Sequence, residues 1–460
     1  MAIKTLLLLF SFFFFSGGAL FVPMIGVVGY VLHYHCWPDN QWWGRELSDW
    51  GLRYAFTIGL CLLIGTLLNK HKLKLGTQVM KAHEWLLVLF WATAMVSMGA
   101  GADLSLYPAD QLYQAMLLDK LSKVVLFCLL MSHVVTTPKR FDILLWTMIL
   151  GTLYTGYQAW DAPPWRFLRA RLDGIGGPDF RESSFLGAHF AMMLPLIGIQ
   201  FLRGGWFAKG LCVLTGMLTV NGLVLTRTRA AFVGACVGIV AAMLFSLKGR
   251  RRRILLYLLP GLLSAAYLTD PGFWTRMKTV RTDAVEQDRS AFTRLLLWEA
   301  AGRMIMDYPM GVGVGNFKRE IGNYDSRLIR RDAHNTFVRC AAELGIAGIG
   351  LMALLVVSAF ICLRQARYLA WRCTDSWQLR YYSYGLAVTV LIMLSCGLFM
   401  TQLYIEEFWW LLTLPVCLLR ASEFEYARSR ATEPTLESEE DQDPNWALPH
   451  HPVQGDLGLI

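Results

Sequence analysis

Charged residues are scarce in this chain. Only 17% of its 460 residues are Asp, Glu, Lys or Arg, whereas 55% are apolar and 17 are Trp. About a quarter of the residues in a soluble globular domain are charged. Apolar runs long enough to cross about 30 Å of hydrocarbon recur along nearly the whole sequence. The composition therefore excludes a soluble enzyme and predicts an all-α polytopic membrane protein, with one membrane domain at residues 1–420.

Several signatures of catalytic or metal chemistry are also absent. The ten Cys include no CxxC pair and most lie within apolar runs, so disulfides and zinc are not expected. The chain has no P-loop, no GxSxG, no paired-carboxylate glycosidase signature and no DxD on a loop predicted to face outward. These absences count against nucleotide-sugar and metal-dependent mechanisms. We expect no metal, no cofactor and no nucleic-acid partner.

The hydrophobic pattern predicts about 12 transmembrane helices. The apolar spans fall at 3–16, 18–34, 53–69, 83–100, 115–135, 140–159, 184–203, 206–225, 229–246, 253–269, 335–364, 380–401 and 406–420. The first two stretches form either two helices or one long bent helix. The beginning of the chain imitates a secretory signal, but its apolar sequence continues to Leu32. Residues 1–34 are therefore expected to remain as membrane segments.

The basic loops predict the orientation, because short loops rich in Lys and Arg stay in the cytoplasm. Every second loop is basic, and the cations concerned are Lys70, Lys72, Lys74, Lys81, Lys139, Arg140, Arg203, Lys209, Lys248, Arg250 to Arg253, Arg364, Arg367, Arg372 and Arg380. The other loops, at 35–52, 101–114, 160–183, 226–229, 270–334 and 402–405, are then expected to face the periplasm of a bacterial inner membrane. Within the long loop, Ser290 to Met306 has the pattern of an amphipathic helix lying on the membrane surface.

The end of the chain differs from the rest. Residues 421–460 contain nine Asp or Glu against two Arg, and they lose the hydrophobic pattern. We therefore expect a disordered acidic cytoplasmic tail there. The membrane domain without this tail is strongly basic, which suits anionic membrane lipids.

The strongest candidate for chemistry is a polar His-Asn pair, His334 and Asn335, at the outer end of a long predicted helix. Asp332 can serve as the N-cap of that helix. An imidazole with an ordinary pKa near 6.5 can take a proton from a sugar hydroxyl at neutral pH. The alternative is an interfacial His that is satisfied by its neighbours.

Glu343 lies about two and a half turns deeper in the same helix, followed by Gly345 and Gly348. An ionisable residue inside a membrane helix is a functional candidate, although structural pairing with an Arg explains it equally well. The two glycines have a spacing that permits close helix contact.

Arginines on the outer loops form the second group of candidates. Arg227 and Arg229 lie at the outer end of a helix pair, and Arg294 precedes Trp298 on the predicted surface helix. Guanidinium groups bind phosphate oxygens in pairs, so these residues could hold a lipid-linked diphosphate as the leaving group. Contact with lipid head groups is the alternative. Supporting candidates in the loop at 160–183 are Arg171 and Arg181.

Taken together, three motifs resemble the O-antigen ligase and polymerase family of polyprenyl-diphosphate glycan transferases. They are Arg227-Thr-Arg229-Ala-Ala-Phe-Val, Arg294-Leu-Leu-Leu-Trp298, and His334-Asn-Thr-Phe followed by Glu343-Leu-Gly-Ile-Ala-Gly348. The resemblance covers about residues 180 to 420. It implies an architecture like that of type C glycosyltransferases, an undecaprenyl-diphosphate glycan donor and metal-independent, inverting transfer.

The resemblance also implies roles for single residues. Arg229 and Arg294 would bind the diphosphate, and His334 would be the base or would orient the acceptor. Both Arg227 and Arg229 are candidates for one family arginine, and the spacing to Val233 favours Arg229. We expect a ligase whose acceptor is a glycolipid such as the lipid A core; a polymerase of the same family is the alternative.

Two other classes of function are consistent with a polytopic chain. A transporter could use the charged residues Asp119, Lys120, Lys123 and Glu343 as a coupling path, but no inverted repeat is visible. A lipid-binding scaffold without catalytic activity is the other alternative.

Overall fold

The computed structural model describes residues 3–49, 51–75, 78–103, 107–168, 170–246, 289–373 and 376–432, together with residues 259, 263, 267 and 269. Its α-helices are α1 (Ile3–Phe21), α2 (Pro23–Cys36), α3 (Trp42–Asp49), α4 (Tyr54–Leu68), α5 (Ala82–Ala100), α6 (Pro108–Val134), α7 (Pro138–Trp160), α8 (Ser183–Arg203), α9 (Trp206–Thr226), α10 (Arg229–Phe245), α13 (Arg289–Asp307), α14 (Phe317–Tyr324), α15 (Thr336–Trp371), α16 (Trp377–Gly397) and α17 (Glu406–Thr432). Most of the predicted span at 253–269, the cations at 248–253 and residues 433–460 lie outside this part of the chain.

The described residues are almost entirely helical. Short 3₁₀ helices occur at Pro38–Asn40, Pro164–Arg166 and Ser326–Leu328. Strands β1 (Phe167–Leu168) and β2 (Arg171–Leu172) form one small antiparallel pair in which Phe167 lies opposite Leu172. The prediction of an all-α chain is therefore confirmed for these residues.

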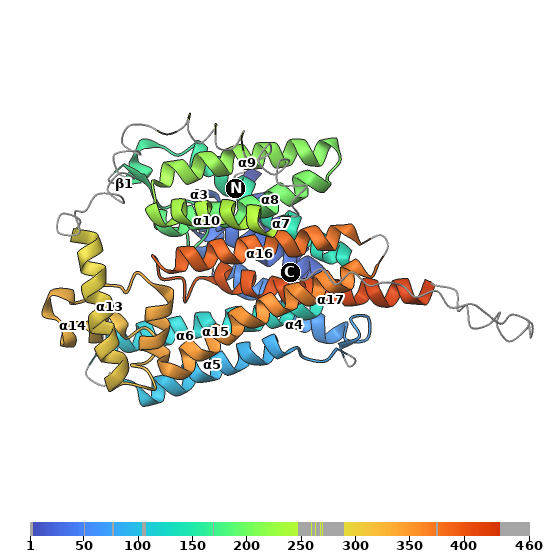
Figure 1. Ribbon diagram of the computed structural model, residues 1–460. Helices are drawn as coiled ribbons and strands as arrows, with labels where there is room; N and C mark the ends of the chain where they lie inside the picture. Colours follow the sequence, from blue (N-terminus) through green and yellow to red (C-terminus); the bar gives the residue numbers. More distant parts are fainter. Residues whose placement is uncertain are drawn as a thin grey trace, which may run out of the picture.

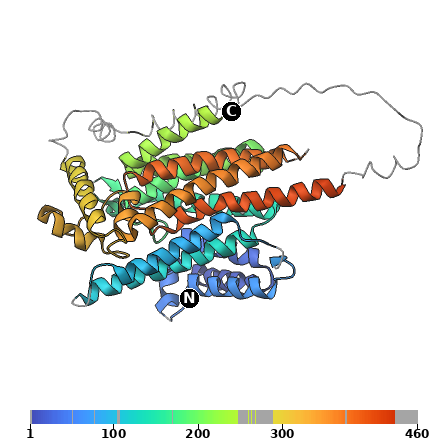
Figure 2. The ribbon, with the colours of Figure 1, turned by 60° about the horizontal axis from the view of Figure 1, so that its bottom comes forward.

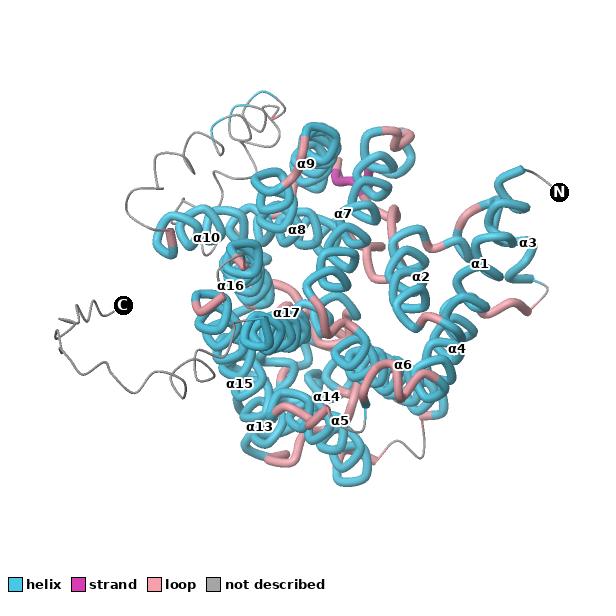
Figure 3. The backbone as a smooth tube through the Cα atoms, turned by 90° about the vertical axis from the view of Figure 1, so that its right-hand side faces the viewer, coloured by secondary structure: helices cyan, strands magenta, loops and turns pink. Residues whose placement is uncertain are grey.

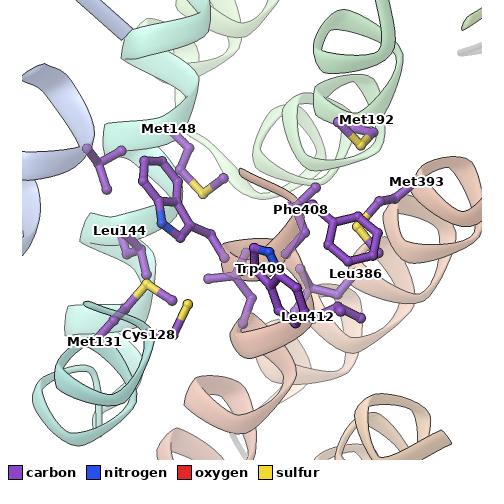
Figure 4. Close-up of a cluster of buried hydrophobic side chains, with 14 of the residues drawn as sticks. Cys128, Met131, Leu144, Met148, Met192, Leu386, Met393, Phe408, Trp409 and Leu412 are labelled. Atoms are coloured by element: carbon purple, nitrogen blue, oxygen red, sulfur yellow. The ribbon is translucent and has the colours of Figure 1, made fainter. Parts of the chain in front are cut away.

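The long helices run side by side in a bundle, and α17 passes through its middle (Figure 3). After Glu406 and Glu407, residues 408–419 of α17 are nearly all apolar, as expected for a helix surrounded by protein. Trp409 and Trp410 in this segment are at most 1% exposed. Figure 4 shows Trp409 in a cluster of buried side chains that also includes Leu144 and Met148 of α7. The core of the bundle therefore forms around α17.

The outer surface of the bundle suits a lipid environment. Five described helices are long and apolar enough to cross a membrane: α1, α8, α9, α15 and α16. The helices α4 and α10 are apolar but shorter. Large apolar side chains such as Phe10, Trp206 and Phe207 are exposed, as is typical of a surface that faces hydrocarbon. These observations support a multi-pass membrane protein, and the number of about twelve spans remains a prediction.

The beginning of the chain forms two helices. Pro23 is the first residue of α2, where a missing N–H costs no helical hydrogen bond. The two helices then pack as a hairpin, because Cβ atoms added at Gly26 and Gly29 would lie 2.8 Å from Ala19 and 2.6 Å from Phe15. The alternative of one long bent helix is thereby excluded.

The final described helix continues past the predicted boundary at residue 420. Residues 421–432, which we expected in a disordered tail, form the last part of α17. Hydropathy alone placed the boundary, whereas polar contacts hold this segment: Lys81 Nζ lies 2.6 Å from Glu423 Oε1. One turn earlier, Arg420 Nη2 lies 2.7 Å from the buried Glu84 carboxylate. The rest of the predicted tail lies outside the described residues.

Loops that were predicted to share one side of the membrane do lie together. At one end of the bundle, the Arg203 guanidinium donates hydrogen bonds to Asp142 at 2.5 Å and to Gln378 at 2.8 Å, joining the ends of α7, α8 and α16. At the other end, Ala102 N donates to Val312 O at 3.1 Å. Helices α13 and α14 lie at this second end in two views (Figures 1 and 2). We call it the α13 end.

Helix α13 confirms the predicted helix at Ser290 to Met306 but not its location on a membrane surface. Its Leu297, Ala300 and Met304 are buried in a second hydrophobic cluster, which they form with Val312, Phe317, Ile321, Leu328 and Ala333. Phe292 and Leu295, on another side of the helix, are exposed. One part of the apolar surface that we expected to face lipid therefore packs against protein, and the other part is exposed. The protein that covers it is the segment at 308–333, which contains α14 and folds back against α13.

Candidate functional site

His334 lies two positions before α15, directly before its N-cap, at the α13 end. Asn335 is the N-cap, and its Oδ1 accepts hydrogen bonds from Phe337 N at 2.9 Å and Val338 N at 3.0 Å. This corrects the expectation that Asp332 caps the helix. His334 itself has a φ of +47°, a left-handed conformation that is uncommon for residues other than Gly. Such backbone conformations cluster at functional sites.

The surroundings of His334 keep its imidazole neutral at neutral pH. Its pKa lies below the ordinary value of 6.5, first because the ring is partly buried; Asp332 opposes this effect, and the positive charges of Arg294, Lys318 and Arg331 add to it. The side chain remains partly exposed. A neutral imidazole with an accessible lone pair can accept a proton from an incoming hydroxyl.

Helix α13 carries Arg294 to the same place. Trp298, one turn after Arg294, donates a hydrogen bond from Nε1 to Ala333 O at 3.1 Å. This bond fixes α13 against the residue next to His334, and Arg294 is close enough for its charge to lower the pKa of His334. Two residues that the sequence predicted as partners are therefore brought together from positions 40 apart.

Arg227 and Arg229 form a tight turn between α9 and α10. Arg227 is the C-cap of α9, with a left-handed φ of +46°, and Arg229 is the first residue of α10. The two side chains therefore start from different positions: Arg227 from the end of α9 and Arg229 from the beginning of α10. This geometry leaves both residues as candidates for the family arginine.

Arg171, one of the supporting candidates, is hydrogen-bonded to this turn. Its Nη2 donates hydrogen bonds to Thr228 Oγ1 at 3.2 Å and to Ser184 Oγ at 3.3 Å, and its Nε donates to Thr226 O at 3.4 Å. Arg171 thereby ties the turn to the first residues of α8. Arg181 lies elsewhere in the loop, with its guanidinium 4.8 Å from the centre of the Trp37 ring.

Glu343 is part of a buried ion-pair network. Its Oε1 lies 2.8 Å from Arg339 Nε and accepts a hydrogen bond from Phe317 N at 3.2 Å, while Tyr404 OH donates to Oε2 at 2.5 Å. Arg339 also contacts Asp332 Oδ1 at 3.3 Å. The structural alternative therefore accounts for Glu343: its carboxylate fixes the beginning of α14 and the loop before α17 to α15.

Gly345 interrupts α15 two residues after Glu343. Its φ of +70° and ψ of −168° are not helical, and the loop at 309–313 fills the break. Ile346 N donates to Pro309 O at 3.0 Å, and Val312 N donates to Ala342 O at 2.9 Å. A Cβ atom at Gly345 would lie 2.3 Å from Pro309 O, so only Gly fits. The close approach that the glycine spacing predicted is made by this loop and not by another helix.

Residues 214–353 match the family model described as O-antigen ligase. This segment is O-antigen ligase-like. The resemblance drawn from the three motifs is thereby confirmed. No curated protein matches the chain.

The O-antigen ligase-like segment contains most of the candidate residues. Arg227, Arg229, Arg294 and His334 lie within it. Arg171 lies before it and reaches it through hydrogen bonds to Thr226 and Thr228. The supporting loop and the matched segment therefore form one structural unit.

Glu182 lies within electrostatic reach of both Arg171 and Asp332, and its role was not predicted from the sequence. Its pKa is raised, first by partial burial and then by Asp332; Asp173 adds to the rise, while Lys318 and Arg171 oppose it. The residue is thus within electrostatic reach of Arg171, which braces the arginine turn, and of Asp332, which precedes His334 by two positions. Its position directly before α8, next to Arg181, was the only signal available.

A basic cavity that shares Lys318 with the surroundings of His334 was also missed. It has a volume of about 240 Å³ and is lined by Asp110, Tyr113, Gly315, Asn316, Lys318, Arg319 and Arg330. Lys318 contributes to both places, because its charge also lowers the pKa of His334. The three cations come from a segment that the motifs do not include. Their positive charge makes the cavity suitable for an anionic group of a substrate.

Proposed function

We propose that the protein transfers a glycan from undecaprenyl diphosphate to an acceptor hydroxyl on the periplasmic face of the inner membrane. The observation that carries this proposal is the juxtaposition of a neutral His334 with Arg294, enforced by the hydrogen bond between Trp298 and Ala333. A base and a diphosphate-binding cation are the two groups that transfer from a lipid diphosphate requires. The match to the O-antigen ligase model supports the same assignment.

The reaction follows from the charges that develop. His334 removes the proton as the acceptor oxygen attacks the anomeric carbon from the face opposite the diphosphate, which inverts the configuration there. The bond between that carbon and the diphosphate oxygen breaks, and the departing diphosphate gains negative charge. Arg294 and the arginine of the 227–229 turn stabilise this charge. The donor is already activated, so the transfer step needs no nucleotide and no metal.

The two arginines of the turn are expected to differ in effect. Arg229→Ala should reduce turnover about 10²- to 10³-fold, as for the loss of one preorganised group that stabilises a developing anion, whereas Arg227→Ala should cost less than about tenfold. Initial rates with a purified lipid-linked donor measure both. Arg303→Ala is the control, because Arg303 is an exposed cation of α13 that pairs with Glu299. The reverse ranking would assign the family role to Arg227.

The orientation can be tested at Ser326, an exposed residue at the α13 end. A cysteine introduced there should react with a membrane-impermeant maleimide added to spheroplasts, whereas one at Ser246, at the far end of α10, should react only after the membrane is broken. The unsubstituted protein provides the background from native thiols. Protection of position 326 in intact spheroplasts would contradict a periplasmic site.

We propose a ligase rather than a polymerase, with a glycolipid such as the lipid A core as acceptor. Deleting the gene separates the two activities. Loss of a ligase leaves long glycan chains on the lipid carrier, and loss of a polymerase leaves single repeats. Electrophoresis of surface and carrier-linked polysaccharide shows which product accumulates, and the accumulation of single repeats would replace the ligase assignment by the polymerase.

A further inference from the structure

Three ionisable side chains meet inside the bundle, apart from the residues discussed above. They are His35 of α2, His189 of α8 and Glu407 of α17, and each offers one ligand atom within 4.8 Å of those of the other two. All three are at most 1% exposed. His189 Nδ1 lies 2.7 Å from Glu407 Oε1, and the centres of the two imidazole rings are 5.3 Å apart.

Two polar atoms of this group have no hydrogen-bond partner. The contact of 2.8 Å between His35 Nδ1 and Val31 O requires a proton on Nδ1, because a carbonyl oxygen can only accept. The neutral ring therefore has a lone pair on Nε2, which is buried and unsatisfied. Glu407 Oε2 is likewise buried and unsatisfied. Two acceptors cannot bond to one another, and leaving both without a donor or a cation is costly.

We infer that His35, His189 and Glu407 bind one divalent transition-metal ion. Two imidazoles and a carboxylate are ligands that zinc prefers, and three protein ligands leave a position for water. The ion would interact with His35 Nε2 and Glu407 Oε2, so both unsatisfied atoms would gain a partner. The role is structural: the ion would connect three helices and takes no part in the transfer step.

The surroundings of the two histidines resemble those of metal ligands. The bond from His35 Nδ1 to a backbone carbonyl leaves Nε2 free for the ion, as is usual for ligating histidines. Thr152 Oγ1 lies 3.3 Å from His189 Nε2 and donates its own proton to Met148 O. Its oxygen can therefore accept from His189 Nε2, which leaves Nδ1 for the ion.

The spacing requires only a small contraction. Donor atoms at about 2.0–2.1 Å from a tetrahedral zinc lie about 3.4 Å from one another. The widest separation in the group is within 4.8 Å, so side-chain shifts of about 1 Å suffice. The contact between His189 and Glu407 would lengthen as the ion takes its place. Gly151 provides room for His35, since a Cβ atom there would lie 2.4 Å from its Cγ.

Through α8, a bound ion would be linked to the turn that contains Arg227 and Arg229. Ser184 of α8 accepts a hydrogen bond from Arg171, which braces that turn, and His189 follows Ser184 by little more than one turn of the same helix. Binding at His189 would fix the first turns of α8 to α2 and α17. These three helices come from distant parts of the sequence, so no short ligand spacing indicated the site, and the sequence analysis expected no metal.

The metal content of the full-length protein in detergent tests this inference. Protein purified without chelators should contain about one zinc per chain, measured by inductively coupled plasma mass spectrometry. Glu407→Gln and His35→Gln should reduce the content at least about tenfold. His83→Gln is the matched control, because His83 of α5 is also a buried histidine with unsatisfied nitrogens but lies outside the group.

A second measurement tests metal binding on the wild-type protein itself. Zn²⁺ added to chelator-treated wild-type protein should raise the midpoint of thermal unfolding, because it binds the folded state. The same addition should leave the midpoint of Glu407→Gln unchanged. Another divalent metal at the same stoichiometry would support the site and replace zinc as its ion. Wild-type protein with no bound metal and no response to Zn²⁺, Mn²⁺, Fe²⁺ or Ni²⁺ would overturn the inference.

Discussion

Replacing His334 with Ala is expected to reduce glycan transfer by about 10²- to 10⁴-fold, the contribution of a positioned general base. The loss should appear in turnover, because the substitution removes the proton acceptor and leaves the arginines in place. Single-turnover rates with purified protein and lipid-linked donor measure this effect. Surface glycan in cells should fall while the amount of membrane-inserted protein stays constant.

The pH dependence links that loss to His334. Since the pKa of His334 is below 6.5, the wild-type rate should fall only as the pH drops through that lower value and the imidazole becomes protonated. Lys318→Gln removes a neighbouring positive charge, so the pKa rises and the acidic limb moves to higher pH. His71→Ala, an exposed histidine in a predicted cytoplasmic loop, is the control. An unchanged rate for His334→Ala would favour the non-catalytic scaffold.

Glu343→Ala is expected to destabilise the protein by about 3–5 kcal/mol, the usual cost of removing one partner of a buried ion pair; Asp332, 3.3 Å from Arg339, is the only acidic partner that Arg339 keeps among the described residues. The substitution leaves Arg339 buried and removes the acceptor of Tyr404 OH and of Phe317 N. The midpoint of thermal unfolding in detergent measures the loss. Helix α14 and the loop before α17 should also become more susceptible to limited proteolysis.

A pair on the surface provides the comparison for Glu343. Glu299 lies 3.6 Å from Arg303 on α13, and both side chains are exposed. Glu299→Ala should therefore change the stability by less than about 1 kcal/mol. If Glu343→Ala keeps wild-type stability but loses activity, Glu343 acts in the reaction or in a transport path instead of holding the fold.

The helices were predictable because long apolar runs and basic loops are local signals. Helix α13 was found from its periodicity within one residue at each end. The end of α17 was not, because Lys81 and the beginning of α5 hold its last turns, and a contact between positions 81 and 423 leaves no trace in local hydropathy. The place of α13 was missed for the same reason, since the loop that covers its apolar face is defined only after folding.

The site divides in the same way. His334, Arg229 and Arg294 stand in motifs with recognisable spacing, and the structure brings His334 and Arg294 together. Glu182 and Lys318 have no such spacing, because folding alone brings Glu182 within electrostatic reach of Asp332 and Lys318 within reach of His334. Arg339, the partner of Glu343, lies one turn before it. Their i, i+4 spacing in a predicted helix could have indicated the ion pair from the sequence.

The break of α15 at Gly345 determines how this protein can be recombined with its relatives. The loop at 309–313 and the helix around Gly345 contact one another through main-chain atoms, so neither surface can be altered by choosing a different side chain. In a chimera that exchanges the loop without the helix, the main-chain atoms of the two segments would come from different proteins and would not fit one another. Exchange of acceptor specificity between such proteins should therefore treat residues 289–371 as one indivisible module, with its junctions placed outside α13 and α15.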